Sequence, residues 1–180
     1  MSQTFKISYY WEKLREANYF LEIVDANKIF VSLSYFLSLY KGQFIISVQE
    51  HDACFDLRPD LSTIFEDIPL VLEKLTKDTQ LPVEFDFFEQ GTDIGMLMER
   101  QGDIIKVRFE TTAASAMKFQ FLPDTNILVS AWEFLGQWLQ FIRAVLDAIV
   151  ELQPELVLDE SYKQYTTHLS AVEELIIIKI

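Results

Sequence analysis

The sequence predicts an α+β fold, in which an antiparallel sheet of about five strands, centred on residues 83–110, carries helices packed on one face. Polar and apolar residues alternate along 83–110, as is typical of half-buried strands. Apolar residues recur every three or four positions along 128–152, which indicates a long amphipathic helix near the C-terminus. Half of the 180 residues are hydrophobic and only five are glycine and five proline, so we expect one ordered domain over residues 1–180.

The first predicted element is a helix over residues 10–24, where apolar side chains follow one another at steps of four, three, four and three. The next segment, residues 28–40, fits two patterns. Ile29, Val31 and Leu33 alternate with serines, as in a strand. Ile29, Leu33 and Phe36 also share one side of a helix. The β-branched and aromatic content favours a strand that turns at Lys41-Gly42 and pairs with residues 43–49.

Asp60 is a favourable N-cap residue, so a helix is expected to begin there and to bury an apolar stripe from Leu61 to Leu75. Pro69 lies within this segment and has no backbone N–H to donate. The segment is therefore expected to form either one kinked helix or two short helices.

The clearest sheet signal is a three-stranded meander over residues 82–110. A two-residue turn at Gln101-Gly102 places Met98 opposite Ile105, so that the apolar residues of both strands share one face. The preceding strand, paired across residues 90–93, adds Phe85 and Phe87 to this apolar face. We expect the long C-terminal helix to cover this face.

The other face of the meander is expected to be polar. It carries charges of both signs, on Glu84, Asp86, Lys106 and Arg108. We interpret the two acids as partners of the two cations in cross-strand ion pairs. The same register places Phe88 opposite Gly95, where an aromatic ring can cover the missing side chain.

Two helices are predicted at the C-terminal end. The first is opened by residues 123–126 and ended by Pro154, about 40 Å long at the rise of an α-helix. Its apolar stripe passes through Leu135, Trp138 and Ile142. The second starts near Asp159 and leads into the apolar residues 176–180, which we expect to be docked on the body or buried in a homodimer.

The charge balance excludes several partners. Lys and Arg total 15 and Asp and Glu total 28, which gives a net charge of −13. Such a surface repels nucleic acid and anionic lipid, so neither a nucleic-acid nor a membrane partner is expected. The N-terminus lacks a signal-peptide pattern, and the single cysteine, Cys54, favours a cytoplasmic location.

The residues that bear catalytic or metal-binding chemistry do not form a recognisable site. His51, Asp52, Cys54 and Asp56 have metal-ligand side chains, but on a strand His51 points away from the other three. Cys54 is expected to be a core residue. The chain also lacks a glycine-rich phosphate loop. No catalytic, cofactor-binding or metal-ligating residue is therefore assigned, and no cofactor is expected.

These observations favour a non-enzymatic cytoplasmic protein that binds a basic protein through an acidic surface, such as an inhibitor or immunity-type protein for a basic enzyme. The segment 50–67 has a net charge of −5 and is the candidate binding surface. Its acids are Glu50, Asp52, Asp56, Asp60, Glu66 and Asp67. The alternative is a small-molecule-binding protein or an enzyme, with a pocket between sheet and helices. A homodimer is compatible with both functions.

Overall fold

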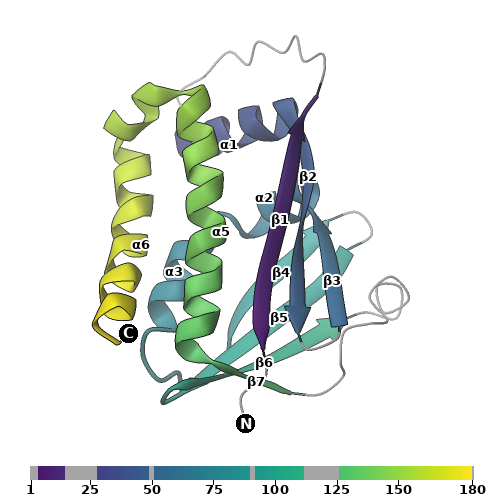
Figure 1. Cartoon of the computed structure of the whole chain (residues 1–180), viewed down its shortest axis with the longest axis vertical. Helices are drawn as coiled ribbons and strands as arrows, with labels where there is room; N and C mark the ends of the chain where they lie inside the picture. The colour runs from purple at the N-terminus through teal and green to yellow at the C-terminus, as the bar shows by residue number, and fades with distance from the viewer. Residues whose placement is uncertain (1–3, 15–27, 49–50, 90–91, 112–125, 180) are drawn as a thin grey trace.

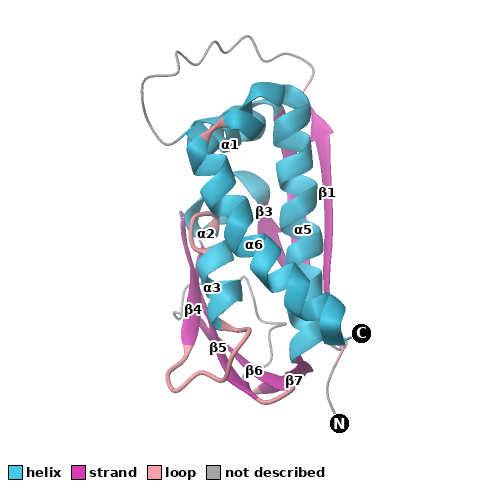
Figure 2. Cartoon of the chain, turned by 90° about the vertical axis from the view of Figure 1, so that its left-hand side faces the viewer, coloured by secondary structure: helices cyan, strands magenta, loops and turns pink. Residues whose placement is uncertain are grey.

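Two antiparallel sheets and a set of helices make up the described part of the computed structural model, which comprises residues 4–14, 28–48, 51–89, 92–111 and 126–179 (Figure 1). The α+β class is confirmed, but the strands belong to two sheets and not to one. Figure 2 shows the helices gathered on one side, with strands of both sheets behind them. One hydrophobic core contains side chains from both sheets and from the helices.

The first sheet has the strand order β1-β2-β3 and the second has the order β4-β5-β6-β7. The strands are β1 (Phe5–Lys13), β2 (Tyr40–Val48), β3 (His51–Asp56), β4 (Val83–Glu89), β5 (Thr92–Gln101), β6 (Ile104–Thr111) and β7 (Ile127–Ser130). The α-helices are α1 (Lys28–Leu39), α2 (Ser62–Ile64), α3 (Ile68–Lys74), α5 (Ala131–Leu152) and α6 (Glu160–Lys179). A π-helical turn, η1 (Leu57–Leu61), precedes α2, and a 3₁₀ turn, η2 (Pro154–Leu158), joins α5 to α6.

Both secondary-structure predictions for the N-terminal part were wrong where the structure describes the chain. Residues 10–13 continue strand β1, and the rest of the predicted helix beyond residue 14 lies outside the described residues. Residues 28–39 form helix α1 and not a strand, because the helical stripe is the one that becomes buried: Ile29, Leu33 and Phe36 are each at most 2% exposed. Packing of the helical stripe therefore outweighed the composition that favoured a strand.

The predicted turn at Lys41-Gly42 is also wrong, because both residues lie within β2. Gly42 pairs with Trp11 of β1, and a Cβ at Gly42 would overlap the carbonyl oxygen of Tyr10. The glycine therefore permits a close approach of two strands.

The meander of the second sheet is confirmed, with a register that differs from the predicted one by two residues. Met98 pairs with Val107, not Ile105, because the turn consists of Gly102 and Asp103. Gly102 has a φ of +63°, a conformation that glycine adopts without strain. A shift of two residues leaves every side chain on its expected face. Phe85 accordingly is buried on the apolar face, as predicted.

Helix α5 contacts both sheets, although it begins later than predicted. The sequence expectation began at residues 123–126, whereas residues 127–130 form β7 and Ser130 caps α5 by accepting a hydrogen bond from the Glu133 N–H at 3.4 Å. Trp138 is fully buried, 4.8 Å from Phe85 of the second sheet and 6.5 Å from Phe44 of the first, between ring centroids. Pro154 follows the end of the helix, as expected.

The predicted polar face of α5 has a structural role. Glu133 Oε1 accepts a hydrogen bond from the Phe5 N–H at 3.4 Å, and Gln137 Oε1 accepts one from the Ile7 N–H at 2.9 Å. These two donors lie on the edge of β1 that β2 does not pair. Helix α5 therefore covers a sheet edge that would otherwise expose unpaired backbone groups.

The predicted break at Pro69 is confirmed, since α2 and α3 are separate short helices and Pro69 lies in the first turn of α3. At the other end of the chain, α6 buries Tyr165, Leu169 and Val172 as expected. Of the apolar residues that end α6, Ile176 packs against the core, while Ile177 and Ile178 are exposed.

Candidate functional site

The outer face of the second sheet carries five described carboxylates, of which Glu99 pairs with Lys106. We call the other four the acidic sheet face: Glu84, Asp86, Asp93 and Glu110. Strand alternation places them there, because Phe85, Phe87, Ile94 and Phe109 take the inward positions. Pairing then aligns Asp86, Gly95 and Glu110 in one row across three strands. All four carboxylates are at least partly exposed.

The carboxyl groups of Glu84 and Asp86 lie together beside Gly95, where a Cβ would be 2.3 Å from Glu84 Oε1 and 3.7 Å from Asp86 Oδ1. The glycine makes room for this arrangement, because a Cβ at position 95 would overlap Glu84 Oε1. Partial desolvation raises the pKa of Glu84 to about 7, and the hydrogen bond to Asp86 and repulsion from Asp86 and Glu110 add to this effect. At neutral pH these carboxyls therefore share a proton part of the time.

The two cations of this face have other partners. Arg108 Nη2 lies 2.6 Å from Glu110 Oε1, and Lys106 Nζ lies 3.8 Å from Glu99 Oε2. Among the described residues, neither Glu84 nor Asp86 has an ion pair, so the predicted pairing of these acids with the cations was wrong.

The two-residue difference in register explains this error. The expected alignment placed Asp86 in the row of Lys106, whereas the structure places it in the row of Glu110. Sequence reasoning therefore recognised that Glu84 and Asp86 share a face but missed Asp93 and Glu110 as their neighbours. The dipeptide Gly102-Asp103, which is typical of a two-residue hairpin turn, was the signal in the sequence that could have fixed the turn.

The acids of segment 50–67 do not all lie on one surface. Asp52 and Asp56 are exposed on the outer face of β3, and Glu66 and Asp67 are exposed between α2 and α3. Asp60, which was expected at a helix N-cap and on the binding surface, is 1% exposed and accepts a hydrogen bond from the Asp56 N–H at 2.7 Å. It therefore satisfies an edge donor of β3 and cannot contact a partner. Glu50 lies outside the described residues.

The metal-ligand side chains of β3 are distributed as strand geometry requires. Asp52, Cys54 and Asp56 are exposed on one face, while His51 is on the other. Cys54 was expected in the core, but Ala53 and Phe55 take the buried positions. Within the described ranges, no group of three or more His, Cys, Asp or Glu residues is arranged to hold a metal ion.

The space between sheets and helices, where the alternative hypothesis placed a pocket, is packed with aromatic side chains. Phe44 stacks on Phe55 and on Phe141, with ring centroids 5.0 Å apart in each pair. Hollows occur instead on the helical side of the molecule. One of about 300 Å³ is lined by Glu66 and Asp67 and by His168, whose Nδ1 lies 2.5 Å from Glu73 Oε2.

Comparisons with protein-family models, with curated proteins and with solved structures find no match to this chain. In the part of the chain that the structure describes, no helix is long and apolar enough to cross a lipid bilayer. Function is therefore inferred from the geometry and charge of the acidic sheet face.

Proposed function

We propose that this chain is a non-enzymatic binding module that docks a cationic protein on its acidic sheet face. The observation that carries the proposal is the pair formed by Glu84 and Asp86, two carboxyls that lie together with no cation beside them in the described structure. Lysine or arginine side chains of a partner would replace the repulsion between these groups by charge-assisted hydrogen bonds.

The shape and the charge of the face support a protein partner. The four carboxylates lie on an exposed sheet surface, and such a surface suits the broad contact of a protein interface better than the enclosed site that a small molecule needs. The net charge of −13 adds long-range attraction, which speeds the encounter with a cationic partner. The active-site cleft of an enzyme that acts on an anionic polymer is cationic, and such a cleft would suit the acidic sheet face. The specific form of the proposal is therefore an inhibitor or immunity-type protein for a basic enzyme.

Affinity capture with matched baits tests the proposal. The baits are the wild-type protein, the double variant Glu84→Gln/Asp86→Asn, and the control Asp52→Asn/Asp56→Asn, which removes two carboxylates, and at least as much charge, from the outer face of the first sheet. We expect a basic protein that binds at low salt to the wild type and the control, is released by salt, and is lost from the Glu84/Asp86 variant.

Two results would contradict the proposal. Equal capture by all three baits would show that net charge alone attracts the protein. Loss with the Asp52/Asp56 variant only would move the binding surface to strand β3. Circular dichroism of each bait confirms that the comparison is made between folded proteins.

A further inference from the structure

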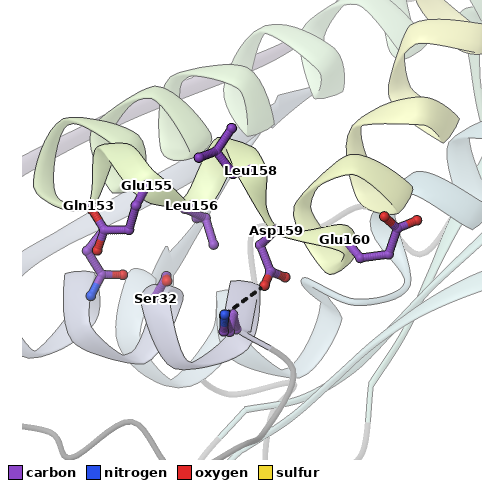
Figure 3. A pocket seen from close by; sticks show the side chains of 8 residues that line it. Ser32, Gln153, Glu155, Leu156, Leu158, Asp159 and Glu160 are labelled. Carbon is purple, nitrogen blue, oxygen red and sulfur yellow. Dashed lines mark ion pairs between the residues drawn. The ribbon is translucent and has the colours of Figure 1, made fainter.

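A hollow of about 430 Å³ lies where α1 meets the turn between α5 and α6 (Figure 3), and we name it the α1–η2 hollow. Its volume is within the range of small-molecule sites. We propose that it binds a small aliphatic ammonium ion, with the charged head at Ser32 and Glu155 and the hydrocarbon part along Leu156 and Leu158. This site is separate from the acidic sheet face and does not depend on the function proposed for it.

The floor of the hollow contains a mostly buried serine, Ser32. The residue is only 4% exposed, and among the described residues its hydroxyl makes no hydrogen bond, but the oxygen is not sealed from the solvent in the hollow. A ligand in the hollow can therefore take the place of water as its hydrogen-bond partner. Figure 3 shows Ser32 on α1 near Gln153 and Leu156, which line the same hollow. An ammonium N–H can donate to the Ser32 Oγ.

The charges around the hollow favour a cation over an anion. Three carboxylates line it, from Glu155, Asp159 and Glu160, against a single cation, Lys28. Lys28 Nζ already lies 3.2 Å from Asp159 Oδ2. Among the described residues, Glu155 and Glu160 have no ion pair, so the uncompensated charge of the lining is negative.

At each of the two helix N-termini at this corner, one backbone donor is already bound by a group of the chain itself. Asp159 Oδ1 accepts a hydrogen bond from the Ser161 N–H at 2.9 Å, at the start of α6. Ser161 Oγ accepts one from the Ile29 N–H at 3.2 Å, at the start of α1. The carboxylate of Asp159 also places a negative charge at the start of α6, where it favours the helix dipole and disfavours a second anion.

The apolar part of the lining fits the hydrocarbon part of such a ligand. Leu156 is 4% exposed and forms part of the inner wall, whereas Leu158 is 74% exposed and stands at the rim. A short alkyl chain lying against Leu158 would remove apolar surface from water on both molecules. The carboxylate of Glu155 lies at the same end of the view as Ser32, and Glu160 lies at the opposite end (Figure 3).

The test is a titration of the ¹⁵N-labelled protein with n-butylamine, in which the NMR chemical shifts of the backbone amides report binding. The control titration uses n-butanol, a neutral molecule of similar shape. We expect saturable shifts centred on Ser32, Leu156 and Asp159 with the amine, and none with the alcohol. Glu155→Gln and Ser32→Ala should each weaken binding about tenfold, the effect of losing one hydrogen bond to a charged group. Glu160→Gln, which removes the same charge at the far end, should change the dissociation constant by less than about twofold.

Three outcomes would overturn the proposal: shifts that do not saturate, equal shifts with the alcohol, or equal weakening by Glu155→Gln and Glu160→Gln. Because Ser32 is buried, its variant is used only if its amide spectrum matches that of the wild type. Glu155 is exposed, so its variant tests the head-group position without this complication.

Discussion

Replacing Glu84 by glutamine should change how the stability of the protein depends on pH. In the folded protein the pKa of Glu84 is raised to about 7 from an ordinary 4.5. At pH values between 4.5 and about 7, the Glu84 carboxyl therefore keeps its proton in the folded state, whereas it has lost it in the unfolded chain. By linkage, the free energy of unfolding falls as pH rises from 4.5 to about 7, and the loss is complete above that range.

The size of this effect follows from the shift and from the exposure of the group. A shift of this size corresponds at most to about 3 kcal/mol, since one pKa unit is about 1.4 kcal/mol. Glu84 is exposed, and solvent screening reduces the value, so we expect about 1 kcal/mol. Glutamine keeps the shape of the side chain and can donate a hydrogen bond to Asp86, but it cannot ionise.

Urea unfolding at a series of pH values measures this directly. We expect Glu84→Gln to be more stable than the wild type by about 1 kcal/mol above pH 7, with the difference shrinking towards pH 4.5. Asp52→Asn, which removes a charge from the other sheet, controls for the general benefit of lowering the net charge. A Glu84→Gln variant no more stable than the wild type at pH 8, or a difference independent of pH, would refute the reasoning.

Three further predictions concern named contacts. Gly95→Ala introduces a Cβ where the Glu84 carboxylate lies, so it should displace that carboxylate and lower the Glu84 pKa towards 4.5 in a ¹³C NMR titration. Trp138→Ala should reduce the free energy of unfolding by about 3–5 kcal/mol, because the ring is fully buried between the two sheets. Ser130→Ala removes the N-cap of α5 and should reduce it by about 1 kcal/mol. Urea unfolding measures both losses.

Each of these predictions has a contradicting result. An unchanged pKa of Glu84 in Gly95→Ala would mean that the raised pKa does not depend on the space left by the missing Cβ of Gly95. A loss below about 1 kcal/mol in Trp138→Ala would mean that the indole is not part of the core. Ser130→Thr keeps the cap oxygen and should retain the stability that Ser130→Ala loses.

The sequence was sufficient to predict which residues of the second sheet are buried but not how its strands align. Side-chain alternation assigns a face to each residue, and a two-residue shift preserves that assignment. Met96 and Val107 are therefore buried as expected although their partners differ from the predicted ones. The composition of the acidic sheet face depends on the alignment itself, which is why Glu110 could not be placed beside Asp86.

Other differences arose where tertiary contacts decide between competing local patterns. Residues 28–39 satisfied both a strand and a helix, and burial of the helical stripe settled the choice. Gln137 has the polarity of a surface residue, but it binds the edge of β1, a contact between segments 130 residues apart. Asp60 was also predicted to be a surface residue because its side chain is polar. Its hydrogen bond to the edge of β3 depends on the fold of the chain, and the hydrophobic pattern of the sequence does not predict it.

The dissociation constant of the captured basic protein most directly tests the central claim that the acidic sheet face is a docking surface. It should be measured at low and at high salt for the wild type, for Glu84→Gln/Asp86→Asn and for Asp52→Asn/Asp56→Asn. We expect the Glu84/Asp86 variant to bind at least about tenfold more weakly at low salt and to show a smaller salt dependence, while the control resembles the wild type. Equal constants for the two variants would contradict the account, because the charge removed would then matter and its position would not.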